Sequence, residues 1–149
     1  MEISKEITMK KLLFLLAISS LVLAACGAQA RSLVGGWKLT SYGPENSPTP
    51  AVAESQASLT LNPDGTITGN SGCNGFGGEY KVDGDQITFT GLVSTLMACT
   101  GPLMEQEGAM FRVLNGTADY KIDGDMLTIT KDGTVLVFAS SQVQSYPYP

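Results

Sequence analysis

One sequence pattern occurs twice in this chain and strongly limits its fold. Residues 80–90 (YKVDGDQITFT) and residues 120–130 (YKIDGDMLTIT) match at a spacing of forty residues. In each copy, alternating apolar and polar residues flank an Asp-Gly pair, which predicts two strands joined by a tight turn. An isolated hairpin is marginally stable at best, because it cannot bury one face. The repeat therefore predicts two related halves of one antiparallel sheet.

Further strands are predicted on both sides of the repeat. Residues 37–42 alternate in polarity and precede a Pro-rich loop at 43–50. Residues 59–61 and 66–68 flank Asn-Pro-Asp-Gly, a sequence suited to a turn. Residues 135–138 are apolar and follow a Lys-Asp-Gly-Thr turn. The fold class that we expect is mainly β with one helix (α+β): a strongly curved antiparallel sheet or a partly open barrel of two related halves, packed on a single helix.

The single helix is predicted over residues 102–115. Pro102 suits the first helical position, and Asn115-Gly116 can end the helix. The predicted packing face is a stripe of apolar residues at helical spacing, namely Leu103, Met110, Phe111 and Leu114. Glu107 interrupts this stripe. Its carboxylate either finds a hydrogen-bond donor at the edge of the core or lies exposed on the rim, with its methylenes covering apolar residues.

The N-terminal segment has the features of a bacterial lipoprotein signal. Lys10 and Lys11 precede an apolar run at 12–23, and Ala-Ala-Cys follows it. The run is shorter than the ~20 residues that a membrane-spanning helix needs. We expect cleavage before Cys26 and lipidation of its thiol, although an ordinary secretory signal is the alternative. Whether Met1 or Met9 is the true start stays open.

These features predict four regions: a signal peptide at 1–25, a lipid-anchored tether at 26–33, a β domain at 34–140 and a flexible tail at 141–149. The protein is expected in the cell envelope, outside the cytoplasm. Beyond residue 25, six basic residues stand against twelve acidic ones, a formal net charge of −6. The basic residues are scattered, which argues against nucleic acid as a partner.

Cysteine use agrees with that compartment. The chain has three cysteines, and lipid on Cys26 leaves Cys73 and Cys99 as a pair in an oxidising environment. We expect them to form a disulfide, which in the chain-entropy model stabilises the fold by roughly 3 to 4 kcal/mol. A metal pair or a reactive thiol is the rival interpretation. The chain has no histidine and no Cys-x-x-Cys spacing, so we expect no metal site and no cofactor.

The segment at 69–78 (GNSGCNGFGG) is the richest in glycine. It lacks the Gly-Lys-Ser/Thr ending of a phosphate-binding loop. The local interpretation is a bulged, disulfide-stapled corner of a curved sheet, with Asn74 bonding its own backbone.

Several motifs together resemble the META domain, the HslJ-like family of bacterial envelope proteins. They are Ser-Gly-Cys-Asn-Gly-Phe-Gly-Gly at 71–78, Ser-Thr-Leu-Met-Ala-Cys at 94–99, Met104 to Glu107 with Phe111, and Trp37 upstream. The resemblance implies a compact β-rich domain with one helix, often carried on lipoproteins and linked in some members to stress response. Members commonly carry basic residues where Gly75 and Leu96 stand, so this chain departs from the pattern there.

Two classes of function follow. The first is a non-enzymatic, lipid-anchored binding or stress-response module that contacts the membrane through its lipid and takes an unknown protein or apolar ligand. The second is a small hydrolase that uses a carboxylate, Glu107 or Asp119, but no partnered base or nucleophile is visible, so we expect no catalytic residue. The candidate binding residues form a list of five: Asn74, Phe76, Thr95, Met97 and Glu107.

Overall fold

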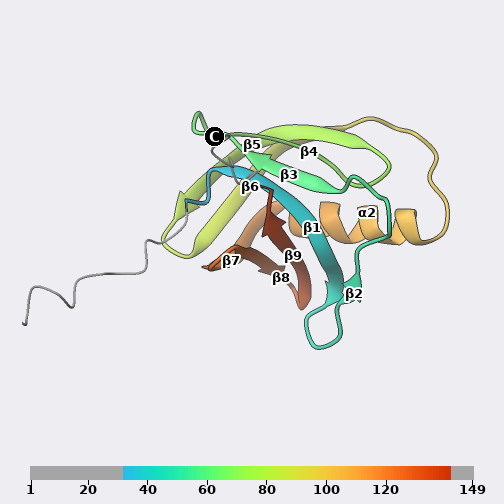
Figure 1. Ribbon diagram of the computed structural model, residues 1–149. Coiled ribbons are helices and arrows are strands. Elements are labelled where there is room, and N and C mark those ends of the chain that lie inside the picture. Colours follow the sequence, from blue (N-terminus) through green and yellow to red (C-terminus); the bar gives the residue numbers. More distant parts are fainter. Residues whose placement is uncertain (1–31, 142–149) are drawn as a thin grey trace, which may run out of the picture. The chain divides into compact units, whose positions relative to one another are not determined.

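The computed structural model describes residues 32–141. The elements in chain order are β1 (Gly35–Pro44), β2 (Thr49–Pro50), β3 (Ser58–Leu61), β4 (Thr66–Asn70), β5 (Gly75–Asp83), β6 (Gln86–Ser94), α2 (Pro102–Val113), β7 (Gly116–Asp123), β8 (Met126–Lys131) and β9 (Thr134–Ser140) (Figure 1). Within this part of the chain, no helix is long and apolar enough to cross a bilayer. The predicted signal peptide, Cys26 and nearly all of the predicted tail lie outside the described residues.

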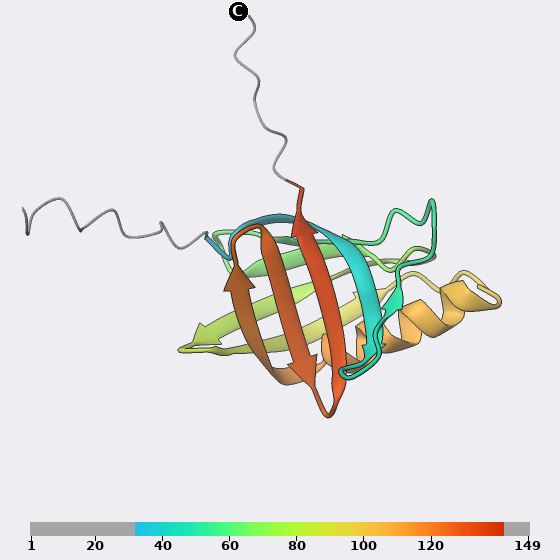
Figure 2. The same ribbon diagram turned by 60° about the horizontal axis from the view of Figure 1, so that its bottom comes forward.

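The strands form one antiparallel sheet that closes into a barrel. Their order is β2-β1-β3-β4-β5-β6-β7-β8-β9, and β9 also pairs with β1 (Figure 2). The short strand β2 adds to β1 outside the barrel, which leaves eight strands in the closed ring. The expected fold class, mainly β with one helix, is therefore confirmed. Closure by β1 and β9 removes the open edge that a partly open barrel would leave.

The two repeated hairpins are neighbours in the barrel. Tyr80 pairs with Phe89 in β5–β6, and Tyr120 pairs with Ile129 in β7–β8, at equivalent positions of the repeat. Each tyrosine hydroxyl also donates a hydrogen bond to a carbonyl in the turn of the preceding hairpin, to Asn62 at 2.8 Å and Gly84 at 3.2 Å. The repeat therefore fixes both the turn inside each hairpin and its contact with the previous hairpin.

Apolar side chains fill the inside of the barrel. The residues that are at most 1% exposed include Trp37, Leu59, Leu61, Ile67, Ile87, Phe89, Leu127, Ile129, Leu136 and Phe138. Burial of each such side chain stabilises the fold by about 1.5–3 kcal/mol. Small barrels are commonly filled by side chains in this way. The interior is therefore an apolar core built from side chains of all parts of the barrel.

The helix α2 packs against β1, β8 and β9. Its buried face is made by residues 106, 109, 110 and 113, which follow helical spacing. Met110 and Leu114 are fully buried as predicted, but Leu103 and Phe111 are only half-buried. The helix ends at Val113, two residues before the predicted end, because β7 already begins at Gly116, where φ is +82°.

Candidate functional site

Three segments meet at one corner of the barrel. They are the turn at 71–74 between β4 and β5, the irregular segment at 95–101 after β6, and the N-terminal half of α2. Inside the turn, the Ser71 N–H donates to the Asn74 carbonyl at 2.8 Å, and the Ser71 hydroxyl accepts from the Asn74 N–H at 3.0 Å. The side chain that organises the turn locally is therefore Ser71.

The Asn74 side chain bonds outward, so the prediction that it bonds its own backbone was wrong. Its Oδ1 accepts from the Thr95 hydroxyl at 2.7 Å and from the Met97 N–H at 2.8 Å. Its Nδ2 donates to the Met97 carbonyl at 3.2 Å and to Glu107 Oε1 at 3.1 Å. The side chain is buried, 3% exposed. Asn74 therefore joins the turn, the 95–101 segment and the helix, contacts between distant segments that local turn rules do not reveal.

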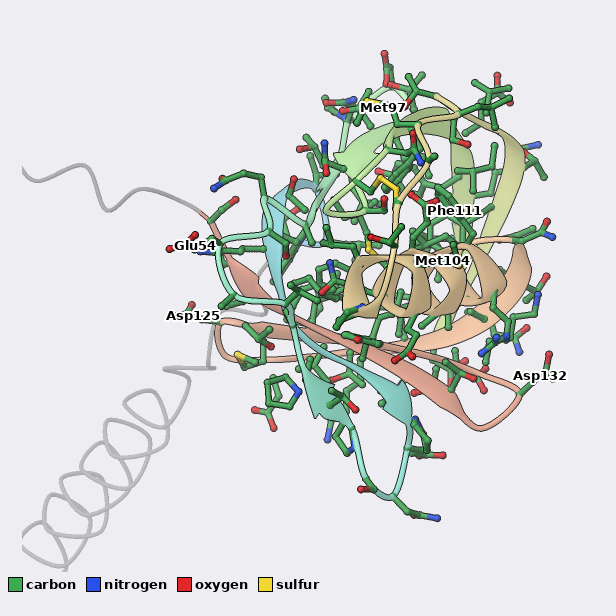
Figure 3. The ribbon with its side chains drawn as sticks, turned by 90° about the vertical axis from the view of Figure 1, so that its right-hand side faces the viewer. Glu54, Met97, Met104, Phe111, Asp125 and Asp132 are labelled. Atoms are coloured by element: carbon green, nitrogen blue, oxygen red, sulfur yellow. A yellow bond between two sulfur atoms is a disulfide. The ribbon has the colours of Figure 1, made fainter. Side chains whose placement is uncertain are left out.

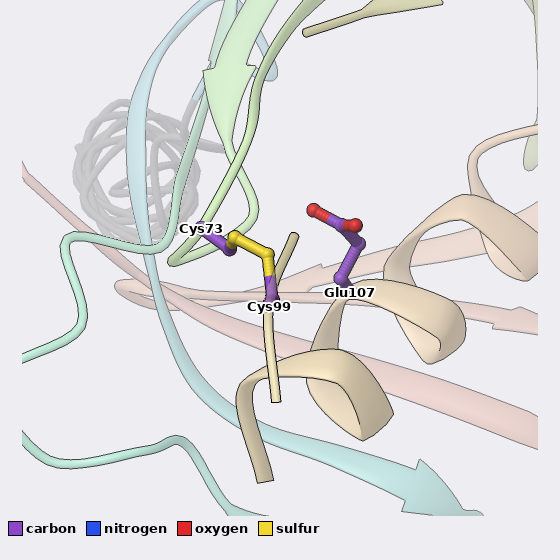
Figure 4. A group of neighbouring side chains, drawn as sticks. All are labelled: Cys73, Cys99 and Glu107. Atoms are coloured by element: carbon purple, nitrogen blue, oxygen red, sulfur yellow. A yellow bond between two sulfur atoms is a disulfide. The ribbon is translucent and has the colours of Figure 1, made fainter. Parts of the chain in front are cut away.

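The predicted disulfide is confirmed. Cys73 and Cys99 are bridged, with their Cα atoms 6.2 Å apart, and the bridge ties the turn to the segment that leads into α2 (Figure 4). The Asn74 amide nitrogen lies 3.7 Å from the Cys73 sulfur and 3.6 Å from the Cys99 sulfur. The bridge and Asn74 thus hold the same two segments together.

Glu107 lies half-buried beside the disulfide. One carboxylate oxygen accepts a short hydrogen bond from the Ser71 hydroxyl, and the other accepts from the Asn74 amide. Ser71 itself is fully buried. Of the two alternatives for Glu107, the structure shows the one in which the carboxylate finds donors at the edge of the core.

Gln106 is a structural residue that the sequence analysis missed. It is fully buried, and its Oε1 accepts from the Val52 N–H at 2.7 Å. Its Nε2 donates to the Ser71 carbonyl at 2.7 Å and to the Ser55 hydroxyl at 3.2 Å. The available signal was a polar residue in register with Met110 and Val113 on the buried face of the helix.

A small surface pocket lies between the end of β6 and α2. Its volume is about 270 Å³, and it is lined by Leu92, Val93, Ser94, Phe111 and Asn115. Phe111 also packs edge-on against Phe76, with ring centroids 5.6 Å apart. Phe76 is only 6% exposed, and a Cβ added at Gly69 would come within 2.3 Å of its ring. Phe76 is therefore a buried packing residue that contacts Phe111 of the pocket lining.

Large apolar side chains are exposed along the same stretch of chain. We call them the β6–α2 apolar surface: Val93 (71% exposed), Leu96 (95%), Met97 (62%) and Met104 (59%). Figure 3 shows Met104 and Phe111 on the helix and Met97 on the segment that leads to it. Of the five predicted binding residues, Thr95 and Met97 are exposed, Glu107 is half-buried, and Asn74 and Phe76 are buried.

The two carboxylates considered for hydrolysis, Glu107 and Asp119, bond to different groups. Both oxygens of Glu107 accept hydrogen bonds within the corner, whereas Asp119 on β7 accepts from Gln86 on β6 at 3.1 Å. Asp119 thus belongs to a cross-strand pair of polar side chains. Nothing in these contacts pairs a carboxylate with an accessible nucleophile.

Comparison with family models identifies the fold. The model of the META domain matches residues 31–143, which is most of the chain. The chain belongs to the META domain family. This match includes every strand of the barrel, the disulfide and the helix, so the resemblance expected from the sequence is confirmed for the domain as a whole.

Two solved structures share this fold. An NMR structure of a protein from Burkholderia xenovorans matches with a TM-score of 0.61 and 24% identity, over 73% of this chain and 83% of that one. A second NMR structure matches with a TM-score of 0.57 and 22% identity, over 71% of this chain and 88% of that one. At these identities the likeness shows the fold alone. The search of curated proteins found no match.

Proposed function

We propose that this META domain protein is a non-enzymatic binding module of the cell envelope, anchored by lipid on Cys26. In this proposal, the β6–α2 apolar surface receives apolar side chains of a protein partner. The observation that carries it is the exposure of Val93, Leu96, Met97 and Met104, of which Val93 also lines the surface pocket. Single apolar residues are normal on a surface, but here four large exposed ones fall within residues 93–104, and exposed apolar surface is typical of interaction sites when it is extensive.

The surface is fixed in place before any partner arrives. Asn74 bonds both the N–H and the carbonyl of Met97, and the disulfide holds Cys99 two residues later. A segment that is already ordered loses less conformational entropy on binding, so more of the contact energy contributes to affinity. The exposure of Leu96 therefore occurs on a fixed loop.

The shape of the surface favours a protein over a small molecule. The pocket of about 270 Å³ is below the usual range of ligand pockets, roughly 300–1,000 Å³. Leu96 is 95% exposed and can enter a pocket on another surface. Buried apolar side chains fill the barrel interior, which favours an occupant that binds on the outer surface.

The lipid anchor rests on the sequence. Two lysines, a short apolar run and Ala-Ala-Cys at residues 24–26 support lipidation at Cys26. The tether from there to the first described residue is short, so an anchored domain would act close to the membrane. The enzymatic alternative has less support, because both Glu107 oxygens are occupied and the neighbouring Ser71 hydroxyl is buried.

Photo-crosslinking in intact cells tests the binding proposal. A photoreactive residue replaces Leu96 in the full chain. In the control it replaces Val82, which is 44% exposed and lies on β5 next to the β5–β6 turn, whereas Leu96 follows the other end of β6. We expect a discrete protein adduct from position 96 and none from position 82. Adding Val93→Ser and Met97→Ser together should lower the adduct yield roughly thirtyfold, since each removes contact energy of about 1 kcal/mol.

Two outcomes would contradict the proposal. Equal adducts from positions 82 and 96 would mean that contact is nonspecific. A small apolar molecule retained in native mass spectrometry, without any protein adduct, would favour the carrier alternative. The substituted side chains are exposed, so their effect on the free energy of unfolding should stay within about 0.5 kcal/mol.

A further inference from the structure

Two sulfurs and a carboxylate lie together at the corner of the barrel. One ligand atom from each of Cys73, Cys99 and Glu107 falls within 4.8 Å of the others (Figure 4). The three residues come from the β4–β5 turn, the 95–101 segment and α2. We propose that, once the disulfide is reduced, the two thiolates and the Glu107 carboxylate bind one Zn²⁺ ion. This proposal does not rest on the proposed binding function.

The chemistry of the three groups selects the ion. Zn²⁺ is borderline soft and takes thiolate and carboxylate ligands in tetrahedral geometry. Mg²⁺ and Ca²⁺ prefer oxygen ligands only. The bridged form cannot act in this way, because a disulfide offers no thiolate. The site therefore exists only in the reduced protein. The disulfide belongs to the oxidised state of the cysteine pair, and the metal site belongs to the reduced state.

The backbone positions suit both forms. Two sulfurs on one tetrahedral Zn²⁺ ion lie about 3.8 Å apart, given Zn–S bonds of about 2.3 Å. The Cα atoms of Cys73 and Cys99 are 6.2 Å apart, in the upper part of the disulfide range of about 4.4–6.8 Å. Rotation of the cysteine side chains can therefore separate the sulfurs while the two segments stay in place.

The ligand group also includes one anionic side chain. Reduction turns the neutral bridge into two thiols, and one ligand atom from each cysteine and from the Glu107 carboxylate lies within 4.8 Å of the others. Among the described residues, the partners of that carboxylate are the Ser71 hydroxyl and the Asn74 amide, and no Lys or Arg side chain pairs with it. A metal ion at this place would therefore displace no cationic side chain from Glu107.

The surrounding groups can orient the ligands. The Ser71 hydroxyl holds one oxygen of Glu107, and the Asn74 amide lies 3.7 Å and 3.6 Å from the two sulfurs. Such hydrogen bonds to ligand atoms are typical around metal sites. The Met97 carbonyl is 3.4 Å from the Cys99 sulfur, so it or a water molecule can complete the coordination.

Reduction requires a reductant, for which we infer a dithiol of the thiol–disulfide oxidoreductase class. Cys73 is half-buried and Cys99 is 9% exposed, so attack falls on the Cys73 sulfur and Cys99 leaves as thiolate. The second thiol of the reductant then resolves the mixed disulfide. Two electrons and two protons pass from the dithiol to the protein, the reductant becomes a disulfide, and Zn²⁺ binding releases the two thiol protons.

Metal titration of the full chain carrying Cys26→Ser tests the site, because Cys73 and Cys99 are then the only thiols. The protein is reduced with a phosphine, and the phosphine is then removed under anaerobic conditions. The reduced protein is titrated with Co²⁺ and then with Zn²⁺. We expect thiolate-to-cobalt absorption that saturates at one metal per chain and is displaced by Zn²⁺. The oxidised protein should give none.

Variants separate the three-ligand site from adventitious thiol binding. Cys99→Ser should abolish the absorption. It is compared with the reduced parent protein, which also lacks the disulfide, so the comparison is not affected by loss of the bridge. Glu107→Gln should weaken Zn²⁺ binding at least tenfold, whereas Glu105→Gln, on an exposed position of the same helix, should leave it unchanged. Absence of the absorption, saturation at one metal per two chains, or equal Zn²⁺ affinity in Glu107→Gln and the parent would overturn the proposal.

Discussion

At the scale of the residue, Asn74 makes the most connections in the corner. One amide group bonds Thr95, Met97 and Glu107, and it does so while 3% exposed. An asparagine suits this position because its side chain offers both a two-proton donor and an acceptor. Aspartate would lose the donor and would place a second carboxylate next to Glu107.

Removal of this amide should be costly. Asn74→Ala leaves the Met97 N–H and one Glu107 oxygen without their partner, so we expect a loss of about 2–4 kcal/mol in the free energy of unfolding. Urea unfolding of the oxidised protein measures it. Asn46→Ala, at an exposed loop position, is the matched control and should change stability by less than about 0.5 kcal/mol. A similar small loss at Asn74 would show that water replaces its bonds.

Asp64 predicts one part of the acid dependence of stability. The hydroxyl and then the N–H of Thr66 donate to its carboxylate, at 2.6 Å and 2.9 Å, and these bonds lower the pKa of Asp64. A lowered pKa in the folded state means that its contribution is present above the unfolded pKa of about 3.9 and is lost as pH falls through the folded value.

Asp64→Asn should therefore flatten the acid limb of the stability curve. The amide oxygen can still accept from Thr66, but it does not titrate in this range. Urea midpoints between about pH 5 and pH 2 measure the difference, with Asp83→Asn in the next hairpin turn as the matched exposed variant. An identical slope in Asp64→Asn and the parent would rule out this contribution.

At the scale of the element, the hairpins were predictable and the helix face was less so. The Asp-Gly repeat and the Asn-Pro-Asp-Gly turn carry local signals, and the strands formed where those signals placed them. The helix face depends on what the barrel offers. Gln106 occupies a core position because Val52, Ser55 and Ser71 supply partners from segments far away in sequence. Hydrophobic spacing alone cannot detect such partners.

The disulfide gives the element-scale prediction. It closes a loop with a sequence separation of 26 between Cys73 and Cys99, so Cys73→Ser should reduce the free energy of unfolding by about 2–5 kcal/mol. Thermal and urea unfolding measure the loss, with Ser71 and Asn74 unchanged. Two free thiols in the folded, unreduced protein would contradict the bridge itself.

At the scale of the whole molecule, closure of the barrel could not be predicted from the sequence. Alternation indicates which residues face the core, but the pairing of β1 with β9 joins residues about a hundred positions apart. The candidate binding residues show the same limit. The motifs predicted that Asn74, Thr95 and Met97 lie close together, and their hydrogen bonds show that they do. However, Asn74 and Phe76 are buried and act as structural residues, whereas Met97 is exposed. Exposure depends on the assembled fold, which no single motif encodes.

Membrane attachment is the prediction for the whole chain. If Cys26 is lipidated after cleavage, intact mass of membrane-extracted protein should show loss of residues 1–25 and added acyl mass. Two or more acyl chains hold a protein stably on a bilayer, whereas one chain binds only weakly. Cys26→Ala should therefore move the protein from the membrane to the soluble fraction or leave the signal uncleaved. Val34→Ala, beyond the predicted tether, is the matched control, and a chain unaffected by Cys26→Ala would contradict the anchor.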